Sequence, residues 1–200
     1  MAATDRRRRQ RDTLRARILD AAGQLFATEG YEAVTLRRIA NAIDYSPTTV
    51  YLHFADKQAL LQALCDETFD RLVHRLERLR ARTGGPLAFL REGLLAYARF
   101  GLAHPHHYTA TFILGTNPDA AHPYEGSAGA RAFGLLRQAV QDARDAGAIA
   151  VDDTDTAAQT LWAAAHGVTS LLIRHPGFPF VGRTRLVTHT IDAVLRGMRP

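Results

Sequence analysis

Residues 48–53 gather hydroxyl, phenol and imidazole groups and contain no carboxylate. Thr48, Tyr51 and His53 can each donate a hydrogen bond to a phosphate oxygen or to the edge of a base. Lys57 adds an ammonium group where a following helix is expected to begin, and such a helix start can hold a phosphate. The stretch therefore has the chemistry of a nucleic-acid contact.

Two short helices joined by a tight turn are expected to position this stretch. Thr35 can cap the first helix, and apolar residues then recur at helical spacing. Asp44 tolerates the left-handed backbone that a sharp turn requires. Ser46 can cap the second helix, and Pro47 stands at its first position, where a missing N–H costs nothing. The pattern predicts a helix-turn-helix with its second helix over residues 48–54.

This pattern defines candidate DNA-contacting residues around the two N-caps and the second helix. They are Thr35, Leu36, Arg37, Ser46, Pro47, Thr48, Thr49, Tyr51, Leu52, His53 and Lys57. A short helix with a hydroxyl-rich outer face suits the major groove of double-stranded DNA. The alternative is an ordinary helical corner without a nucleic-acid role, because short motifs also match by chance.

The segment 35–61, TLRRIANAIDYSPTTVYLHFADKQALL, resembles the DNA-binding segment of the tetracycline-repressor (TetR) family of bacterial transcription regulators. The shared features are a Thr-capped helix with Ile-Ala, a turn, a Ser, a short helix with Tyr and Phe, and a Lys before a Leu-rich helix. The chain departs from the family pattern at Asp44, where many members have Gly, and at Arg38, where many have an acidic residue. The resemblance covers about the first third of the chain and makes the helical-corner alternative a minority interpretation.

Positive charge is concentrated at the N-terminus. The formal net charge of the chain is +5, from 25 basic and 20 acidic residues. Residues 1–17 hold seven arginines and two acids, so their excess equals that of the whole chain. We predict a disordered basic arm over residues 1–12 that favours a polyanion such as DNA. The alternative is a solvated tail without a partner.

Cysteine usage and hydropathy bear on the compartment. The single cysteine, Cys65, excludes an intramolecular disulfide and fits a reducing environment, and its apolar helical face predicts burial. The sequence has no apolar run of membrane-spanning length and no apolar segment after its N-terminal arginines that would make a secretion signal. We therefore expect a cytoplasmic protein without a membrane partner.

Helical periodicity runs through most of the chain, and strand alternation does not occur. The fold class expected is all-α, with about nine helices in an N-terminal three-helix head and a C-terminal ligand-binding and dimerisation domain. Outside the motif, helices are expected over 13–29, 56–82, 87–104, 105–114, 128–146, 153–174 and 183–198. The expected domains are the helix-turn-helix domain over 13–57 and the ligand-binding and dimerisation domain over 58–200, connected through the helix 56–82.

The last two helices are the candidates for a homodimer interface, because helix-turn-helix proteins usually bind two half-sites as pairs. The candidate residues are Leu161, Ala165, Val168, Thr169, Leu172, Val187, Ile191, Val194 and Leu195. Two such helices from each subunit would form a four-helix bundle. The alternative is that these apolar faces are buried within one subunit.

The run Trp162-Ala-Ala-Ala-His-Gly167 resembles one C-terminal type of the same family, marked by Trp-x-x-x-His-Gly. The resemblance implies that the C-terminal part binds a small molecule and that binding changes the spacing of the two heads, so that DNA is released. Aromatic and polar side chains between the long helix and the last two helices suggest a pocket for a small, apolar or aromatic effector. Its candidate residues are Tyr97, Phe100, His104, His107, Tyr108, Thr111, Phe112, Phe133, Trp162 and His166. The alternative is that the aromatic residues are core.

Metal and catalytic chemistry are not expected. His104, His106, His107 and His122 do not have the spacing of a zinc site, and no cysteine lies nearby. The sequence lacks a phosphate-binding Gly loop, and Gly126–Gly129 has the wrong spacing for a nucleophile elbow. We predict no cofactor, no metal and no enzyme activity.

These observations predict a homodimeric DNA-binding regulator of the TetR type, most simply a repressor that a small-molecule effector releases from a double-stranded operator. Two alternatives are a regulator controlled by a protein partner and a helical enzyme with a basic N-terminus.

Overall fold

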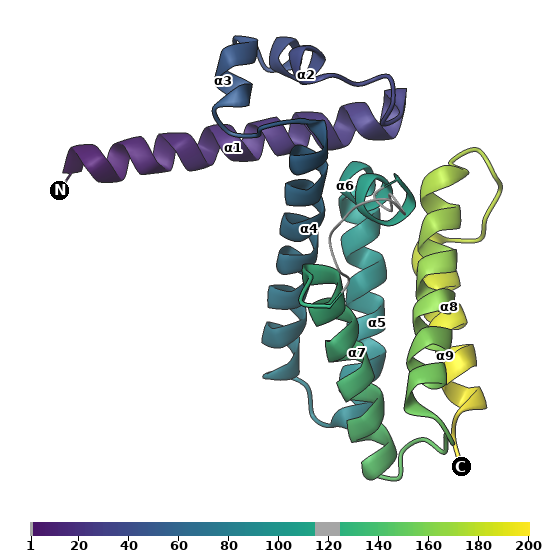
Figure 1. Cartoon of the computed structure of the whole chain (residues 1–200). Coiled ribbons are helices and arrows are strands. Elements are labelled where there is room, and N and C mark those ends of the chain that lie inside the picture. Colours follow the sequence, from purple (N-terminus) through teal and green to yellow (C-terminus); the bar gives the residue numbers. More distant parts are fainter. Residues whose placement is uncertain (1, 115–124) are drawn as a thin grey trace. The chain divides into compact units, whose positions relative to one another are not determined.

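The computed structural model describes residues 2–114 and 125–200, which form nine α-helices and one π-helical segment and contain no strand. The all-α prediction is therefore confirmed. The chain divides into two compact units (Figure 1). The first unit is Met1–Thr68 with His106–Ala121, and the second is Phe69–Pro105 with His122–Pro200.

The first unit contains the helix-turn-helix. Its elements are α1 (Ala2–Glu29), α2 (Leu36–Ala42), α3 (Pro47–Tyr51), the start of α4 (Lys57–Arg80), α6 (Pro105–Thr109) from His106 onward, and the π-helical segment η1 (Ala110–Leu114). The expected caps are present: Thr35 Oγ1 accepts from Arg38 N at 3.1 Å, and Ser46 Oγ accepts from Thr49 N at 3.2 Å. Asp44 has a φ of +59°, which gives the tight turn between α2 and α3.

The N-terminal residues differ from the sequence prediction. Residues 2–12 form the first turns of α1 and not a disordered arm. Arginine and glutamine are good helix formers, and no Gly or Pro interrupts the run, so the helix that packs in the head continues outward. Thr13 Oγ1 also donates to Arg9 O at 2.8 Å. The arginines of this end are therefore presented on a helix.

A single apolar core joins the helices of the first unit. It includes Ile18 and Phe26 of α1, Ile39 of α2 and Val50 of α3, all fully buried. Cys65 is buried beside them as expected, and burial raises the pKa of its thiol to about 11.

The segment after residue 105 also belongs to this core. Ala110 of η1 is fully buried in the same apolar cluster, and Leu114 packs against it. The expected domain boundary at residues 57–58 placed this segment in the C-terminal domain. Sequence order suggested that assignment, whereas apolar packing places residues 106–114 with the head.

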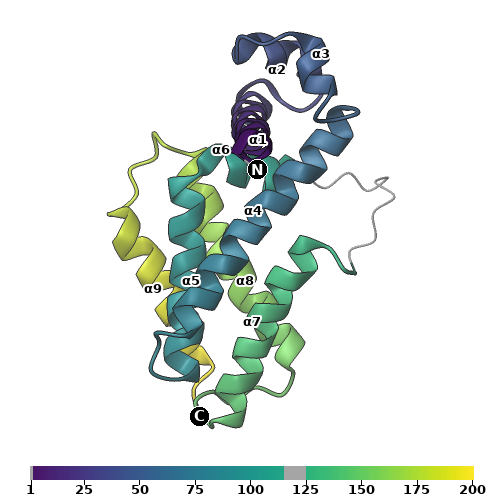
Figure 2. The same ribbon diagram turned by 90° about the vertical axis from the view of Figure 1, so that its left-hand side faces the viewer.

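The second unit is a bundle of helices around α5 (Pro86–Ala103). The other complete helices are α7 (Ala128–Asp145), α8 (Thr154–Arg174) and α9 (Arg183–Gly197), and α4 contributes its residues from Phe69 onward. α5 packs against α7, α8 and α9, and these helices run alongside one another (Figure 2).

The residues predicted for the dimer interface lie inside this bundle. Val194 is partly buried, and the other eight are buried within a single subunit: Leu161, Ala165, Val168, Thr169, Leu172, Val187, Ile191 and Leu195. The interface prediction was wrong for these eight residues. Helical periodicity identifies an apolar face, but it does not tell whether the same chain or a second copy covers that face.

Candidate nucleic-acid interface

The short helix α3 turns its polar side outward. Val50 is fully buried, whereas Tyr51 and Leu52 are 56% and 75% exposed and Thr48 is exposed. α3 ends at Tyr51, and Leu52 and His53 form a turn in place of the last part of the predicted helix. The hydroxyl of Thr48 and the phenol of Tyr51 are therefore accessible, and the side that faces outward carries no carboxylate.

Two predicted contact residues act mainly on α3 itself. Ser46 Oγ lies 2.9 Å from Thr49 Oγ1 and also accepts the Thr49 backbone N–H. These bonds satisfy a free amide at the start of α3 and fix its entry angle. Pro47 is half-buried in the first turn. The cap therefore positions the exposed groups of α3.

Around α2, the structure separates the predicted residues by burial. Leu36 is buried in the core of the first unit, so its prediction as a DNA contact was wrong. The apolar residue that follows the cap lies on the inward face of the helix. Thr35 caps α2 through its hydroxyl, and Arg37 is exposed and free to meet a phosphate.

Lys57 binds the protein's own backbone. Its Nζ donates to Tyr31 O at 2.8 Å and to Glu32 O at 3.4 Å, and it lies 4.2 Å from the centroid of the Tyr31 ring. The ammonium group thus ties the start of α4 to the loop after α1. The sequence did not reveal these carbonyl partners, because they lie 26 and 25 residues away along the chain. It therefore suggested a phosphate as the partner of the Lys57 ammonium group.

His53 is half-buried in the turn that follows α3. Burial lowers the pKa of its imidazole, and the guanidinium groups of Arg11 and Arg15 lower it further. Arg15 also lies over the ring of Phe54 at 4.8 Å. The His53 ring is therefore neutral at neutral pH and offers one hydrogen-bond donor and one acceptor.

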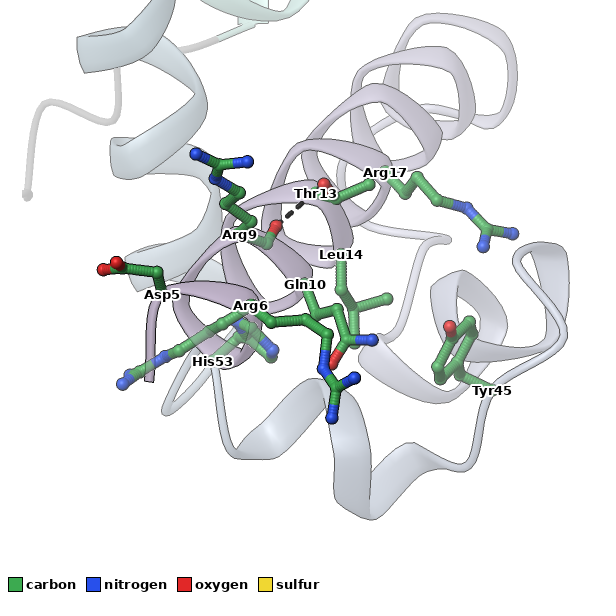
Figure 3. A pocket seen from close by; sticks show the side chains of 10 residues that line it. Asp5, Arg6, Arg9, Gln10, Thr13, Leu14, Arg17, Tyr45 and His53 are labelled. Atoms are coloured by element: carbon green, nitrogen blue, oxygen red, sulfur yellow. Dashed lines mark hydrogen bonds between the residues drawn. The ribbon is translucent and has the colours of Figure 1, made fainter. Parts of the chain in front are cut away.

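A groove of about 830 Å³ runs beside α3 within the first unit (Figure 3). It is lined by Asp5, Arg6, Arg9, Gln10, Arg11, Thr13, Leu14 and Arg17 of α1 and by Tyr45 and His53. Arg17 closes one side, because its Nη2 donates to Ile43 O at 3.2 Å and its guanidinium lies 5.4 Å from the Tyr45 ring centroid. Sequence reasoning did not identify this groove, although Arg6, Gln10 and Leu14 follow the four-residue spacing of one helix face.

The predicted effector residues fall into both units. In the second unit, Tyr97 Oη lies 3.2 Å from His166 Nδ1, and the Trp162 ring lies 6.0 Å from the His166 ring and 6.1 Å from the Phe133 ring. Burial lowers the pKa of His166. Trp162 is 42% exposed, so a ligand can reach this aromatic group. Phe100 contacts His104 in the same unit, with ring centroids 5.0 Å apart.

The other predicted effector residues belong to the first unit. His107 Nε2 lies 2.9 Å from Asp20 Oδ1 of α1, and Tyr108 is fully buried against Phe112. Thr111 is buried as well, next to the thiol of Cys65. His122 of the predicted histidine group lies outside the described residues.

Two further observations concern the described part of the chain. Residues 2–114 and 125–200 contain no group of three or more His, Cys, Asp or Glu side chains that could hold a metal ion. None of the helices described there has the length and apolarity needed to cross a membrane.

Comparison with known families gives two matches. Residues 18–64 match the family of bacterial regulatory proteins called tetR, and residues 90–194 match the Tetracyclin repressor-like, C-terminal domain. The second match alone covers more than half of the chain. It does not distinguish the type marked by Trp-x-x-x-His-Gly, which stays a prediction.

Individual proteins give the same picture. The HTH-type transcriptional repressor Rv1474c of Mycobacterium tuberculosis is 35% identical over 94 residues, which are 47% of this chain and 43% of that protein. The HTH-type transcriptional repressor AcnR of Corynebacterium diphtheriae is 32% identical over 99 residues, 48% of this chain and 45% of that protein. The aligned stretch thus spans less than half of either relative. A solved structure from Rhodococcus sp. RHA1, described as a protein with unknown function, has a TM-score of 0.74 at 27% identity and covers 94% of this chain and 96% of its own.

Proposed function

The chain belongs to the tetR family of bacterial regulatory proteins, and we propose that it is a homodimeric repressor that a small molecule releases from its operator. The family consists of transcription regulators and not of enzymes, so the helical-enzyme alternative no longer applies. Because its proposed partner is the bacterial chromosome, we place the protein in the cytoplasm.

The exposed face of α3 is the observation that carries the DNA-binding proposal. Val50 anchors the helix in the core, while Thr48, Tyr51 and Leu52 project outward. Side chains held on a rigid, capped helix keep a fixed geometry, which reading of base edges requires. The positive charge of α1 favours the same partner.

The outward face of α8 and α9 supports a homodimer. On α8, Ala163, Gly167 and Leu171 follow at steps of four residues, and Leu171 is 48% exposed. On α9, Ala193 and Gly197 are exposed at the same spacing. A Cβ atom added at either glycine would meet no atom within 4 Å, so the subunit itself leaves this face uncovered.

Small side chains let helices of two copies approach closely and form a four-helix bundle. We therefore assign the dimer contact to this outward face, in place of the buried residues that periodicity suggested. Half-sites about 34 Å apart, or a multiple of that distance, would then match the two heads.

The aromatic group of Tyr97, Phe133, Trp162 and His166 supports an effector site in the second unit. Rings and one imidazole–phenol pair suit a small aromatic or apolar molecule that also accepts or donates one hydrogen bond. Trp162 is the only tryptophan of the chain. Its fluorescence therefore reports binding at this group directly.

A selection experiment tests the proposed function. Duplexes enriched from a random pool would be measured by fluorescence anisotropy with wild type and with Tyr51→Ala. We expect Tyr51→Ala to weaken binding about 5- to 150-fold, because a base or phosphate contact contributes about 1–3 kcal/mol. Phe178→Ala serves as the matched control, since Phe178 is an exposed aromatic residue of the second unit. Equal affinities for all three proteins would contradict the role of α3.

The effector is tested with the bound complex. A library of small aromatic and aliphatic molecules would be screened for quenching of Trp162, and each hit would be added to the protein–duplex complex. We expect a true effector to quench the fluorescence and to release the duplex. Quenching without release would contradict effector control at this group.

A further inference from the structure

A cavity of about 640 Å³ lies at the end of the bundle where α5 begins and α9 ends, near the C-terminus (Figure 2). All its lining residues belong to the second unit. None of them is Tyr97, Phe133, Trp162 or His166. The cavity is therefore separate from the aromatic group to which we assign the effector.

Two contacts hold the walls of this cavity in place. Arg91 of α5 donates from Nε to Asp192 Oδ1 of α9 at 2.6 Å and from Nη2 to Asp192 Oδ2 at 3.0 Å. Met198 O, just after α9, accepts the backbone N–H of Ala150 at 2.7 Å. Ala150 follows two residues after Ala148, which lines the cavity. The start of α5, the end of α9 and the segment after α7 are thus fixed around one space.

The carboxylates at the cavity already have partners. Besides its two bonds to Asp192, Arg91 donates from Nη1 to Glu92 Oε1 at 2.9 Å, and Arg99 Nη2 donates to Glu92 Oε2 at 3.1 Å. Two arginines therefore balance two acids in this network. The hydrogen bonds from Arg91 lower the pKa of the Asp192 carboxyl, so that it stays ionised at neutral pH.

Two further arginines of the cavity remain uncompensated. Arg196 and Arg199 are exposed, and neither forms an ion pair within residues 2–114 and 125–200. Arg199 N donates to Arg196 O at 3.3 Å, a tight final turn that places both residues on one side of the chain. Both line the cavity. The cavity thus presents two positive charges that no carboxylate of the described chain offsets.

The rest of the lining is apolar or carries no side chain. Leu87 and Ala88 of α5 and the buried Leu195 of α9 contribute the apolar part. At Gly84 and Gly85, an added Cβ atom would meet nothing within 4 Å, so the entrance beside them is open. A volume of this size, apolar walls and a few polar groups are typical of a site for a small molecule.

We propose that this cavity binds an organic phosphate monoester, with its phosphate on Arg196 and Arg199 and its organic part against Leu87 and Leu195. A phosphate monoester carries a charge of about −1.5 to −2 at pH 7, which matches two guanidinium groups. The planar donor fork of each guanidinium fits two oxygens of a phosphate. The proposal concerns a site apart from the effector group and does not depend on DNA binding.

The test compares arginines of the same C-terminal segment. Arg196→Gln and Arg199→Gln each remove one charge from the cavity. Arg185→Gln is the matched control, because Arg185 is exposed in the first turn of α9 and does not line the cavity. Glutamine is a good helix former, and circular dichroism at 222 nm would verify that each variant keeps its helices.

Phenyl phosphate is the probe, and isothermal titration calorimetry at low ionic strength measures its affinity for the full chain. We expect Arg196→Gln and Arg199→Gln each to weaken its binding about five- to tenfold, because a charge-assisted hydrogen bond is lost. Arg185→Gln should change the affinity less than about twofold. Inorganic phosphate and benzyl alcohol should both bind more weakly than phenyl phosphate, because each offers only one half of the ligand.

The contrary outcomes are distinct. Failure of wild type to bind phenyl phosphate, or an equal loss of affinity in Arg185→Gln and Arg196→Gln, would overturn the proposal. Equal binding of inorganic phosphate and phenyl phosphate would show that the apolar walls take no part, and the organic ligand class would be wrong. If Trp162→Phe abolished binding while Arg196→Gln did not, the probe would occupy the aromatic group instead. None of these results bears on the Tyr51-dependent binding of a duplex, so the proposed function stands or falls separately.

Discussion

Helices α3 and α8 are both amphipathic, and on both the candidate contacts lie on the outward face, but the types of residue on that face differ. On α3, the buried Val50 is the anchor and the exposed Thr48 and Tyr51 are the candidate contacts. On α8, the apolar residues predicted as an interface, such as Leu161, turned out to be the anchor. The candidate contacts of α8 are instead small residues of the outward face, such as the exposed Ala163 and the partly exposed Gly167.

On both helices, the binding face is what remains after the residues of the subunit's own core are removed. For a short polar helix the remainder is conspicuous in the sequence, because hydroxyl and aromatic residues stand out. For a long helix such as α8, the outward face is a row of Ala, Gly and Leu. These residue types occur in most helices and do not by themselves indicate a binding face. Substitutions on the buried and on the outward face of α8 would show whether these two faces differ as those of α3 do.

The largest effect is expected for Leu161→Ala. Leu161 is 1% exposed in the second unit, so its truncation removes buried apolar contacts and leaves a cavity. We expect the free energy of unfolding to fall by about 2–5 kcal/mol. Chemical denaturation followed by Trp162 fluorescence measures it. Leu171→Ala, on the exposed side of α8, is the control and should change subunit stability by less than about 0.5 kcal/mol.

The protein concentration distinguishes the two faces further. If Leu161 were an interface residue, the destabilisation by Leu161→Ala would disappear in dilute samples where the dimer dissociates. We expect it to persist at every concentration. Its disappearance would restore the original interface prediction.

The next effect is expected for Gly167→Arg. A Cβ atom added at this position meets no atom of another part of the subunit within 4 Å, and arginine is a better helix former than glycine. The subunit should therefore stay folded while the dimer dissociation constant rises at least about tenfold, or about 1.4 kcal/mol. Analytical ultracentrifugation measures the dissociation constant. An unchanged dimer would place the interface elsewhere.

The sequence predicted features that depend on neighbouring residues, and it did not predict contacts between residues far apart along the chain. The caps Thr35 and Ser46 and the turn at Asp44 depend on neighbours within three residues, and each was predicted. The contact of Lys57 with Tyr31 joins residues 26 positions apart, and that of His107 with Asp20 joins residues 87 apart. No local pattern contains these pairs. The groove beside α3 escaped prediction for the same reason, because its two walls come from separate segments.

A smaller effect is expected for Lys57→Met, which tests whether this cation belongs to the core or to the DNA face. The variant keeps the apolar stem but loses the bonds to Tyr31 O and Glu32 O and the contact with the Tyr31 ring. We expect the first unit to lose about 1–2 kcal/mol of stability while the salt slope of DNA binding stays unchanged.

Arg37→Met is the matched comparison, since Arg37 is exposed at the start of α2. It should reduce the salt slope by about one and leave stability nearly unchanged. A reduced salt slope for Lys57→Met at unchanged stability would show that the ammonium group binds phosphate, as the sequence suggested.

The smallest effect concerns pH and the second unit. Burial lowers the pKa of His166 from its ordinary value of 6.5, so the unfolded chain binds a proton more readily than the folded one below that pH. Above pH 6.5 the imidazole is neutral in both states and does not change stability. As the pH falls through 6.5, stability should decrease, until the folded protein also binds the proton.

Thermal unfolding followed by Trp162 fluorescence should therefore give a lower Tm at pH 5.5 than at pH 7.5, and His166→Gln should reduce that difference. His189→Gln, at an exposed position of α9, is the control. If His166→Gln and His189→Gln change the pH dependence equally, the partly buried imidazole is not its source, and the aromatic group of the second unit would have to be more open to water than its contacts with Tyr97 and Trp162 indicate.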